Sequence, residues 1–338
     1  MNIFFEIWHW LWALFGCSLN LLLIYVAVFK TPKAIRPYAT LIINFAITDF
    51  LECFLDWFTQ LRLIPTPGDI SLTYIANGPC QYINPFSCKL GISLLLHCLP
   101  HAVWSLLLSF GYRYYILHHS ALSRMTLFKI LLLIYIPSLF QGATYWTTLA
   151  TKEQILPLAN KWFPDYHIEL GTGVITGIVD TTNWVAAYGI SHICLPIFPV
   201  YTAIFIVRRK IIKHLEENTQ MMSSDTRAAH AQLLKALTFQ ALVPAFLGVA
   251  VICYILSQTG LVVSPILEYA IFSSFILMPT LSPFTYLCFV RPYRQFFMRV
   301  IRRSMFLPTR PIESSTKAAR FDSGGQVSHF TNTGTAIC

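Results

Sequence analysis

Residues 38–61 read YATLIINFAITDFLECFLDWFTQL, an apolar stretch that carries three acidic residues. A membrane-spanning helix needs about 20 predominantly apolar residues, and this stretch is apolar at most of its positions. Asp49, Glu52 and Asp56 stand at positions i, i+3 and i+7, so they share one face of a helix. A charge near the centre of a bilayer costs roughly 2.5 to 3.5 kcal/mol. We therefore expect this acidic face to point into a helix bundle or towards water.

Six further uncharged or nearly uncharged stretches are each long enough to cross a membrane, and together with residues 38–61 they make seven spans. The expected spans are residues 7–29, 38–61, 90–112, 127–150, 182–207, 236–258 and 266–290. The composition agrees, because 55% of the residues are hydrophobic and 12% are charged, whereas a soluble domain has about 25% charged residues. The sequence predicts an all-α membrane protein in which residues 1–290 form one seven-transmembrane helix bundle.

The basic residues predict the orientation of this bundle. Of the 24 Lys and Arg residues, 20 lie in alternate gaps between the spans or in the tail. These basic segments are residues 30–36, 113–129, 208–235 and 291–320. Because positively charged loops stay in the cytoplasm, we expect the N-terminus outside and the C-terminus inside, which an odd number of spans allows. The net charge of +9 then reflects topology and contact with anionic membrane lipid, not binding of nucleic acid.

The segment after the last span reads RPYRQFFMRVIRRSMF over residues 291–306. Its apolar residues recur at helical spacing from Tyr293 to Ile301, and arginines occupy much of the remaining circumference. This pattern predicts an amphipathic helix in the cytoplasmic interface of the membrane. Residues 307–338 are rich in Ser, Thr, Gly and Pro, so we expect a disordered cytoplasmic tail.

Two cysteines, Cys80 and Cys88, lie in an expected outer loop just before the third span. Because the exterior is oxidising, we expect them to form a disulfide, with two free thiols as the alternative. No GxSxG, HExxH or phosphate-binding glycine loop occurs in the chain. We expect no enzymatic activity and no cofactor.

Polar groups within the spans leave several alternatives open. His97 and His101 stand one helical turn apart, which is a metal-ligand spacing, but a zinc site needs a further ligand. We expect no metal there, and favour histidines that bond to neighbouring helices or line a pocket. The acidic face either couples helices, which suits Asp49, or provides a cation ligand in an outer vestibule, which suits Asp56. Prolines recur inside the expected spans, where each removes a backbone hydrogen bond. They are Pro100, Pro137, Pro196, Pro199, Pro244, Pro279 and Pro283.

Five short segments resemble G protein-coupled receptors, and specifically the nematode chemosensory receptors of the Str superfamily, most closely serpentine receptor class delta. They are NFAITD at 44–49, YRYY at 112–115, LTFQALVP at 237–244, PTLSPFTY at 279–286 and VRPYR at 290–294. The chain departs from the wider rhodopsin-like pattern at two of these segments. Tyr112 replaces the usual acidic residue before the arginine, and Ser282 replaces the Asn of NPxxY. The resemblance covers about residues 7–300.

The resemblance implies a chemosensory receptor in the plasma membrane, with the sensory cilium as its location, that binds a small chemical ligand and activates a heterotrimeric G protein. It implies roles in activation and coupling for seven residues: Arg113, Arg208, Arg209, Gln240, Pro244, Pro283 and Tyr286. The outer halves of the spans offer candidate ligand contacts at His97, His101, Trp104, Tyr254 and Glu268, and Asn44 joins the three acidic residues in a polar cluster. The alternative function is a transporter or ligand-gated channel that uses the acidic face of the second span.

Overall fold

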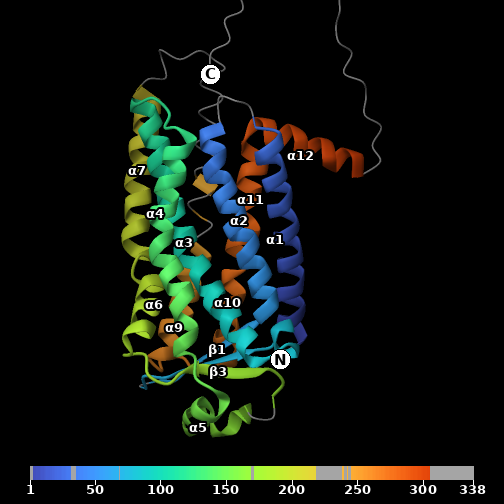
Figure 1. Cartoon of the computed structure of the whole chain (residues 1–338), viewed down its shortest axis with the longest axis vertical. Coiled ribbons are helices and arrows are strands. Elements are labelled where there is room, and N and C mark those ends of the chain that lie inside the picture. The colour runs from blue at the N-terminus through green and yellow to red at the C-terminus, as the bar shows by residue number, and fades with distance from the viewer. Residues whose placement is uncertain are drawn as a thin grey trace, which may run out of the picture.

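The computed structural model describes residues 3–31, 36–67, 69–168, 171–217, 238–239, 242 and 245–304. Its long helices stand side by side in one elongated bundle, with the N-terminus at one end and α12 at the other (Figure 1). The bundle helices are α1 (Ile3–Phe29), α2 (Arg36–Thr59), α3 (Pro85–His118), α4 (Arg124–Thr144), α6 (Trp184–Cys194), α7 (Ile197–Glu217), α9 (Ala245–Gln258), α10 (Pro265–Phe275) and α11 (Leu277–Phe289), and α12 is Arg291–Ser304.

Helices occupy the positions of all seven expected spans. Six helical segments are long and apolar enough to cross a membrane: Ile3–Phe29, Arg36–Thr59, Pro85–His118, Arg124–Thr148, Trp184–His214 and Pro265–Phe289. The helix in the sixth expected span, α9, is shorter, because most residues from 236 to 244 lie outside the described part of the chain. Two of the predicted activation and coupling residues, Gln240 and Pro244, are among these, so their positions are not described.

Two of the expected spans are divided into two helical segments. The fifth is interrupted between α6 and α7, where Pro196 and Pro199 cannot donate backbone hydrogen bonds. The seventh span is interrupted at Ile276, three residues before Pro279. This interruption separates α10 from α11. In contrast, Pro100 lies inside the continuous α3 and Pro137 inside the continuous α4. Proline therefore shapes these helices in two ways, and the sequence alone did not separate them.

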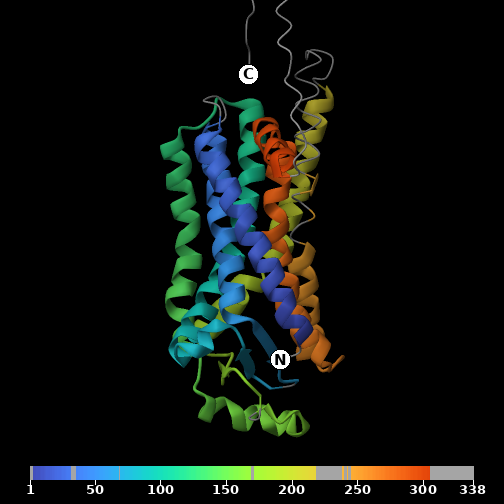
Figure 2. The same ribbon diagram turned by 90° about the vertical axis from the view of Figure 1, so that its right-hand side faces the viewer.

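A small antiparallel sheet closes the end of the bundle where the N-terminus lies, at a place where the sequence had indicated only loops. Its strands are β1 (Leu61–Pro65), β2 (Leu72–Ala76) and β3 (Val174–Ile178), in the order β1-β2-β3. Leu61 pairs with Ala76 in the first ladder, and Leu72 pairs with Ile178 in the second. Figure 2 shows the sheet across the end of the helices, with a further helix beyond it.

That further helix is α5 (Lys152–Trp162), which covers the face of the sheet turned away from the bundle. Alternate strand residues point to opposite faces of a sheet. Leu63 and Tyr74 accordingly join the main core of the bundle, whereas Ile64 and Ile75 pack in a second cluster with Ile155 of α5. The sheet is buried on both faces, which agrees with the many apolar residues in its strands.

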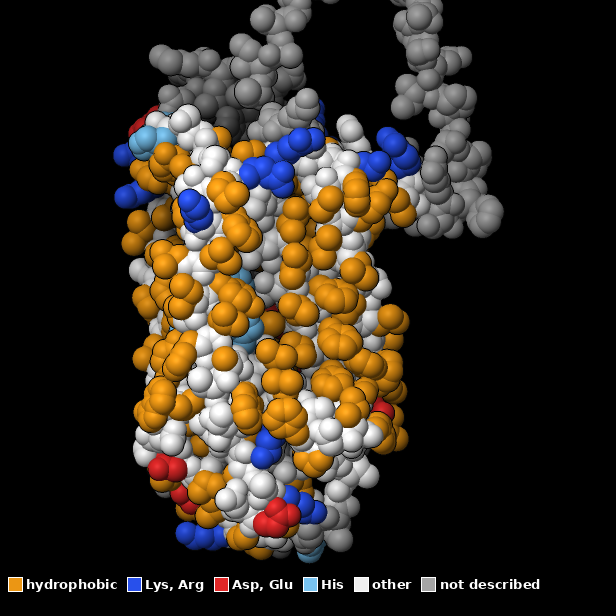
Figure 3. Space-filling model, in the orientation of Figure 1, with side chains coloured by type: hydrophobic (Ala, Val, Ile, Leu, Met, Phe, Trp, Pro, Cys, Tyr) orange, Lys and Arg blue, Asp and Glu red, His pale blue; other side chains and the backbone are white. Residues whose placement is uncertain are grey.

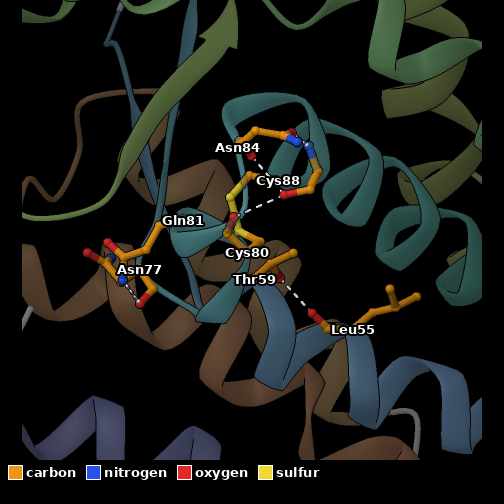
Figure 4. Close-up of a disulfide and its surroundings, with 8 residues drawn as sticks. Leu55, Thr59, Asn77, Cys80, Gln81, Asn84 and Cys88 are labelled. Atoms are coloured by element: carbon orange, nitrogen blue, oxygen red, sulfur yellow. Dashed lines mark hydrogen bonds between the residues drawn. A yellow bond between two sulfur atoms is a disulfide. The ribbon is translucent and has the colours of Figure 1, made fainter.

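The two cysteines that were expected in an outer loop are joined in the structure. Cys80, in the short helix η2 (Pro79–Tyr82), forms a disulfide with Cys88 of α3, and their Cα atoms are 5.0 Å apart (Figure 4). Asn84 caps α3, since its side chain accepts a hydrogen bond of 2.7 Å from the Ser87 amide. The disulfide therefore fixes the chain at the point where the sheet connects to α3.

The surface of the bundle shows a broad hydrophobic band between two ends that carry the charged side chains (Figure 3). At the end opposite the sheet, α12 projects sideways from the bundle (Figure 1). Its Tyr293 is fully buried, and the Tyr293 hydroxyl lies 2.6 Å from Oγ1 of Thr31. Arg291, Arg294 and Arg299 of the same helix are exposed.

Candidate functional site

A cavity of about 60 Å³ lies directly beneath the sheet, between the helices of the bundle. Strand residues Leu63, Leu72 and Tyr74 form its roof. The walls come from α3, the short helix η3 (Tyr145–Thr148), α6, α9 and α10. The wall residues are Leu96, Tyr145, Ile190, Ile193, Cys194, Ala250, Val251, Tyr254, Ile271, Phe272 and Phe275. Segments from five expected spans therefore meet the sheet around one cavity.

The cavity is apolar except for a few hydroxyl and thiol groups. Among the described residues, no Asp, Glu, Lys, Arg or His lines it. The hydroxyl oxygens of Tyr74 and Tyr145 lie 3.0 Å apart and share a hydrogen bond. Burial raises the pKa of the Tyr74 hydroxyl well above its ordinary value, so this group stays protonated at neutral pH. The cavity suits a small apolar molecule held by a hydroxyl group.

An ion pair joins the sheet to α10, one of the helices that form the cavity wall. Arg62 of β1 contacts Glu268 of α10, with Nη2 2.7 Å from Oε2 and Nε donating to the same oxygen at 2.8 Å. The Tyr166 hydroxyl donates to Oε1 of Glu268 at 3.1 Å. Burial, together with the nearby Glu268 carboxylate, raises the pKa of Tyr166 to about 12, which keeps this donor protonated. Both oxygens of Glu268 are therefore occupied.

A second contact ties the sheet to α9. The amide nitrogen Nε2 of Gln258 donates to the backbone carbonyls of Thr66 and Asp69, at 3.0 and 3.1 Å. These carbonyls lie in the connection between β1 and β2. We refer to the sheet, α5 and the short helix η4 (Pro164–Tyr166) together as the lid. The lid is thus tied to both α9 and α10, two of the helices that line the cavity.

The candidate ligand contacts named from the sequence lie in different environments. Tyr254 lines the cavity beneath the lid, and Glu268 forms the ion pair with Arg62. Trp104 is partly buried and packs against the main core. His97 and His101 are buried and face α2 and α4 rather than this cavity.

The two histidines belong to a polar network in the middle of the bundle. His97 Nε2 lies 2.9 Å from the Tyr135 hydroxyl, and His101 Nε2 lies 3.3 Å from Oδ1 of Asn44. Asn44 in turn donates to Oγ of Ser105 at 3.0 Å. Within the described part of the chain, no three His, Cys, Asp or Glu side chains gather as a metal site would require. The network links α2, α3 and α4.

The acidic face of the second span points into the bundle, as expected for charges in a membrane helix. Asp49, Glu52 and Asp56 are 2%, 1% and 2% exposed. Asp56 Oδ2 lies 2.7 Å from Nδ1 of His9 in α1, and His9 Nε2 lies 3.5 Å from Oγ of Ser273 in α10. Asp56 therefore couples three helices rather than opening to an outer vestibule. Neither carboxylate oxygen of Glu52 has a hydrogen-bond partner among the described residues.

The opposite end of the bundle contains Arg113, buried to 3% exposure in α3. Its guanidinium lies over the ring of Tyr38, with Cζ 4.7 Å from the ring centroid. The Nε and Nη1 groups of Arg113 have no hydrogen-bond partner among the described residues. Buried donors are nearly always paired in proteins. Arg113 therefore has fewer hydrogen-bond partners among the described residues than a buried arginine usually has.

Several predicted coupling residues lie at this same end. Tyr286 is buried beside Phe45, with ring centroids 6.2 Å apart, and Pro283 is buried inside α11. Arg208 donates to the Thr238 hydroxyl at 2.9 Å, whereas Arg209 is exposed on α7. The structure thus has the cavity at one end and this buried arginine at the other.

Apart from Tyr254, sequence reasoning did not identify the residues that line the cavity. Arg62 was noticeable as one of four basic residues outside the basic segments, but no motif connects it with Glu268, which is 206 positions away. Tyr74 and Tyr145 lie in segments read as a loop and as the end of a span. Their pairing depends on how the sheet packs against the helices.

Comparison with known proteins decides the family. The model of the serpentine type 7TM GPCR chemoreceptor Srd matches residues 5–299. The chain belongs to this chemoreceptor family. The resemblance drawn from five short segments is thereby confirmed, and the Srd receptor described here is a multi-pass membrane protein with a seven-transmembrane fold.

Individual relatives support the same assignment. This Srd receptor is 62% identical to serpentine receptor class delta-19 of Caenorhabditis elegans over 331 residues, which cover 98% of each chain. It is 60% identical to serpentine receptor class delta-18 of the same organism over 333 residues, again 98% of each chain. The crystal structure of squid rhodopsin matches with a TM-score of 0.61 over 89% of this chain and 85% of the rhodopsin chain. At 14% identity, that match shows the fold alone.

These findings fix the class of the protein. The family consists of chemoreceptors and not of enzymes, as the sequence predicted. They also support a receptor over the alternative transporter or channel. The all-α seven-transmembrane bundle is shown, and the lid sheet is an addition to it.

Proposed function

We propose that this Srd receptor binds a small chemical cue in the cavity beneath the lid and activates a heterotrimeric G protein at the opposite end of the bundle. The observation that carries the proposal is the cavity itself. It is lined by α3, α6, α9 and α10, so a ligand there contacts several helices that continue towards the end with Arg113. A ligand pocket between the helices of a bundle is a common arrangement.

The proposed orientation has the lid outside the cell and α12 in the cytoplasm. Its support is the concentration of 20 of the 24 basic residues in alternate gaps and in the tail. The disulfide between Cys80 and Cys88 belongs to the lid end and suits an oxidising exterior. We further propose the plasma membrane as the location, with the sensory cilium as the compartment suggested by a chemosensory role.

Activation follows from a difference in affinity. A ligand shifts the population of a receptor only if it binds the active arrangement of the helices more tightly than the resting one. Tyr254 lies on α9, and the same span continues to Pro244, while α10 continues through Ile276 into α11 and Pro283. We propose Pro244 and Pro283 as hinges, and Gln240, Arg208, Arg209 and Tyr286 as parts of the coupling surface around Arg113.

Of the candidate ligand contacts, Tyr254 is the one that the cavity supports directly. Glu268 is proposed to act through the lid, because both of its carboxylate oxygens are already occupied. His97, His101 and Trp104 stay predictions, and His97 lines a separate pocket beside α2 and α4. The membrane lipid around the hydrophobic band is the remaining partner in this proposal.

The test is a G protein activation assay in cells that express the full chain, challenged with a panel of volatile and water-soluble compounds. Arg113→Met should reach the cell surface but give no activation. Lys152→Met, which removes an exposed charge from α5, should respond like the unaltered receptor. Activation by Arg113→Met at the normal level would reject the coupling role. Compound-dependent current or uptake without any G protein would instead support the transporter or channel.

The orientation has a separate test. An antibody against an epitope placed after Cys338 should label permeabilised cells only. Labelling of intact cells would place the C-terminus outside and would remove the proposed coupling surface from the cytoplasm.

A further inference from the structure

The chemistry of the cavity lining restricts its ligand more sharply than the family does. Three charged groups at this end of the bundle have partners outside the cavity. Arg62 and Glu268 bind each other, and Nζ of Lys89 donates to the Leu149 carbonyl at 2.7 Å. A charged ligand would therefore enter an apolar space without a counter-charge, which is strongly unfavourable.

The lining does offer one specific hydrogen bond. Tyr74 and Tyr145 are 4% and 1% exposed, and each brings one O–H group to the cavity wall. The 3.0 Å contact between their oxygens uses one of these two hydrogens. A hydroxyl pair of this kind can donate its second hydrogen to an acceptor placed in the cavity.

The position of this hydroxyl pair is fixed by packing. A Cβ added at Gly189 of α6 would lie 2.5 Å from Cδ2 of Tyr145, so the ring fits directly against the α6 backbone. Tyr74 is held in β2, between β1 and β3. The acceptor of the ligand would therefore meet a preorganised donor rather than a mobile side chain, which favours binding.

The size of the cavity sets the size of the ligand. A buried site needs about 10 to 15 Å³ for each water molecule, so a cavity of about 60 Å³ holds roughly four to six water-sized groups. This is far below the range of about 300 to 1,000 Å³ that is typical of drug-sized ligands.

We propose that the cavity takes a small, uncharged, lipophilic compound with one oxygen acceptor, such as a short ketone, ester or alcohol, which bonds to the hydroxyl pair of Tyr74 and Tyr145. This inference rests on the proposed function and specifies the ligand class of the same site.

The experiment measures binding apart from signalling. The full chain is purified in lipid nanodiscs, and the rise in its thermal midpoint is followed as each compound is added. The panel contains neutral ketones, esters and alcohols of small size, and for each skeleton the matching carboxylate, ammonium and hydrocarbon. We expect neutral oxygen compounds to stabilise the receptor, the hydrocarbons to bind more weakly, and the charged counterparts to have no effect.

Two variants test the hydroxyl pair. Tyr145→Phe and Tyr74→Phe keep the rings, and the variant that lacks the donating hydroxyl should bind the neutral oxygen compounds roughly two- to tenfold more weakly, the range of one hydrogen bond. Binding of the hydrocarbons should not change. Tyr82→Phe, at a tyrosine that is 84% exposed, is the matched control and should bind normally.

Three results would overturn the ligand class: stabilisation only by charged compounds, no stabilisation by any neutral oxygen compound, or unchanged binding in both phenylalanine variants. Failure of the proposed function would look different. Neutral compounds would then bind in nanodiscs, and expressing cells would show no G protein activation.

Discussion

The two ends of the bundle each contain a buried charged group, but the two groups differ in how many hydrogen-bond partners they have. At the lid end, the Glu268 carboxylate accepts from Arg62 and from Tyr166, so both of its oxygens are paired. At the other end, the Arg113 guanidinium lies against the Tyr38 ring, and two of its nitrogens have no partner among the described residues. Glu268 therefore contributes to the integrity of the lid, whereas Arg113 is better explained by a function than by stability.

This difference has a physical basis. A buried charge costs free energy unless a partner compensates it, and removing one member of a buried pair leaves the other uncompensated. Replacing a poorly compensated buried group by an apolar one of similar shape is often neutral or stabilising. Substitutions at the two ends should thus change stability in opposite directions, and four experiments examine this contrast.

The largest effect is expected at the lid ion pair. Glu268→Gln should lower the stability of the purified receptor by about 3 kcal/mol, the lower end of the range for breaking a buried pair. We choose the lower end because the Arg62 side chain is 18% exposed, so water compensates part of its charge. The measurement is the thermal midpoint in nanodiscs. Glu153→Gln, at an exposed position of α5, is the control, and equal midpoints for both variants would contradict the assigned role.

The disulfide should have the next largest effect. Replacing both Cys80 and Cys88 by Ser should cost about 2.5 kcal/mol, the value expected from chain entropy for so short a loop, since the two residues are eight positions apart. The loss should appear at the lid end, as faster hydrogen exchange in β1 and β2. Cys288→Ser, at a free cysteine, should leave that exchange unaltered. If the double variant exchanges no faster, the disulfide does not hold the lid.

A smaller loss of stability is expected at the hydrogen bonds between α9 and the lid. Gln258→Ala removes the two hydrogen bonds to the Thr66 and Asp69 carbonyls and should cost about 1 to 2 kcal/mol. The lid would then open more readily, and compounds should leave the cavity faster. Gln295→Ala, at an exposed position of α12, is the control. Unchanged ligand dissociation in Gln258→Ala would show that this contact does not govern the lid.

The smallest effect has the opposite sign. Arg113→Met should leave the thermal midpoint unchanged or raise the stability by about 1 kcal/mol, because an incompletely paired buried group is removed. Arg209→Met, at an exposed arginine of the same end, should have no effect. A loss of 2 kcal/mol or more in Arg113→Met would mean that Arg113 stabilises the resting fold, and the contrast between the two ends would fail.

Much of the architecture could be predicted from local patterns. The apolar stretches gave the seven spans, and the i, i+3, i+7 spacing of Asp49, Glu52 and Asp56 predicted a face that the structure buries. The helical spacing of the apolar residues, with arginines on the remaining circumference, predicted a helix after the last span. Residues 291–304 form this helix, α12. Each of these features depends on residues within one element, where periodicity and burial are directly related.

The candidate site was predicted only in part. Tyr254 lies at the cavity, but the roof strands were read as loops, because short apolar runs in a connection give no clear periodicity when both faces are buried. Glu268 was read as a ligand contact, and its pairing with Arg62 could not be anticipated from either residue. The interruption at Ile276 was also missed, since the chain contains prolines that break a helix and others that do not.

The sequence by itself determined the number of spans and the burial of the acidic face, because hydrophobicity and helical spacing act over one or two turns of a single segment. Five short motifs in it resembled the family that the comparisons confirmed. Only the tertiary structure decided where the cavity lies, which tyrosines supply its donor and how the lid is held. Those features join residues up to 206 positions apart, and the packing of separate helices and strands sets the distances between them.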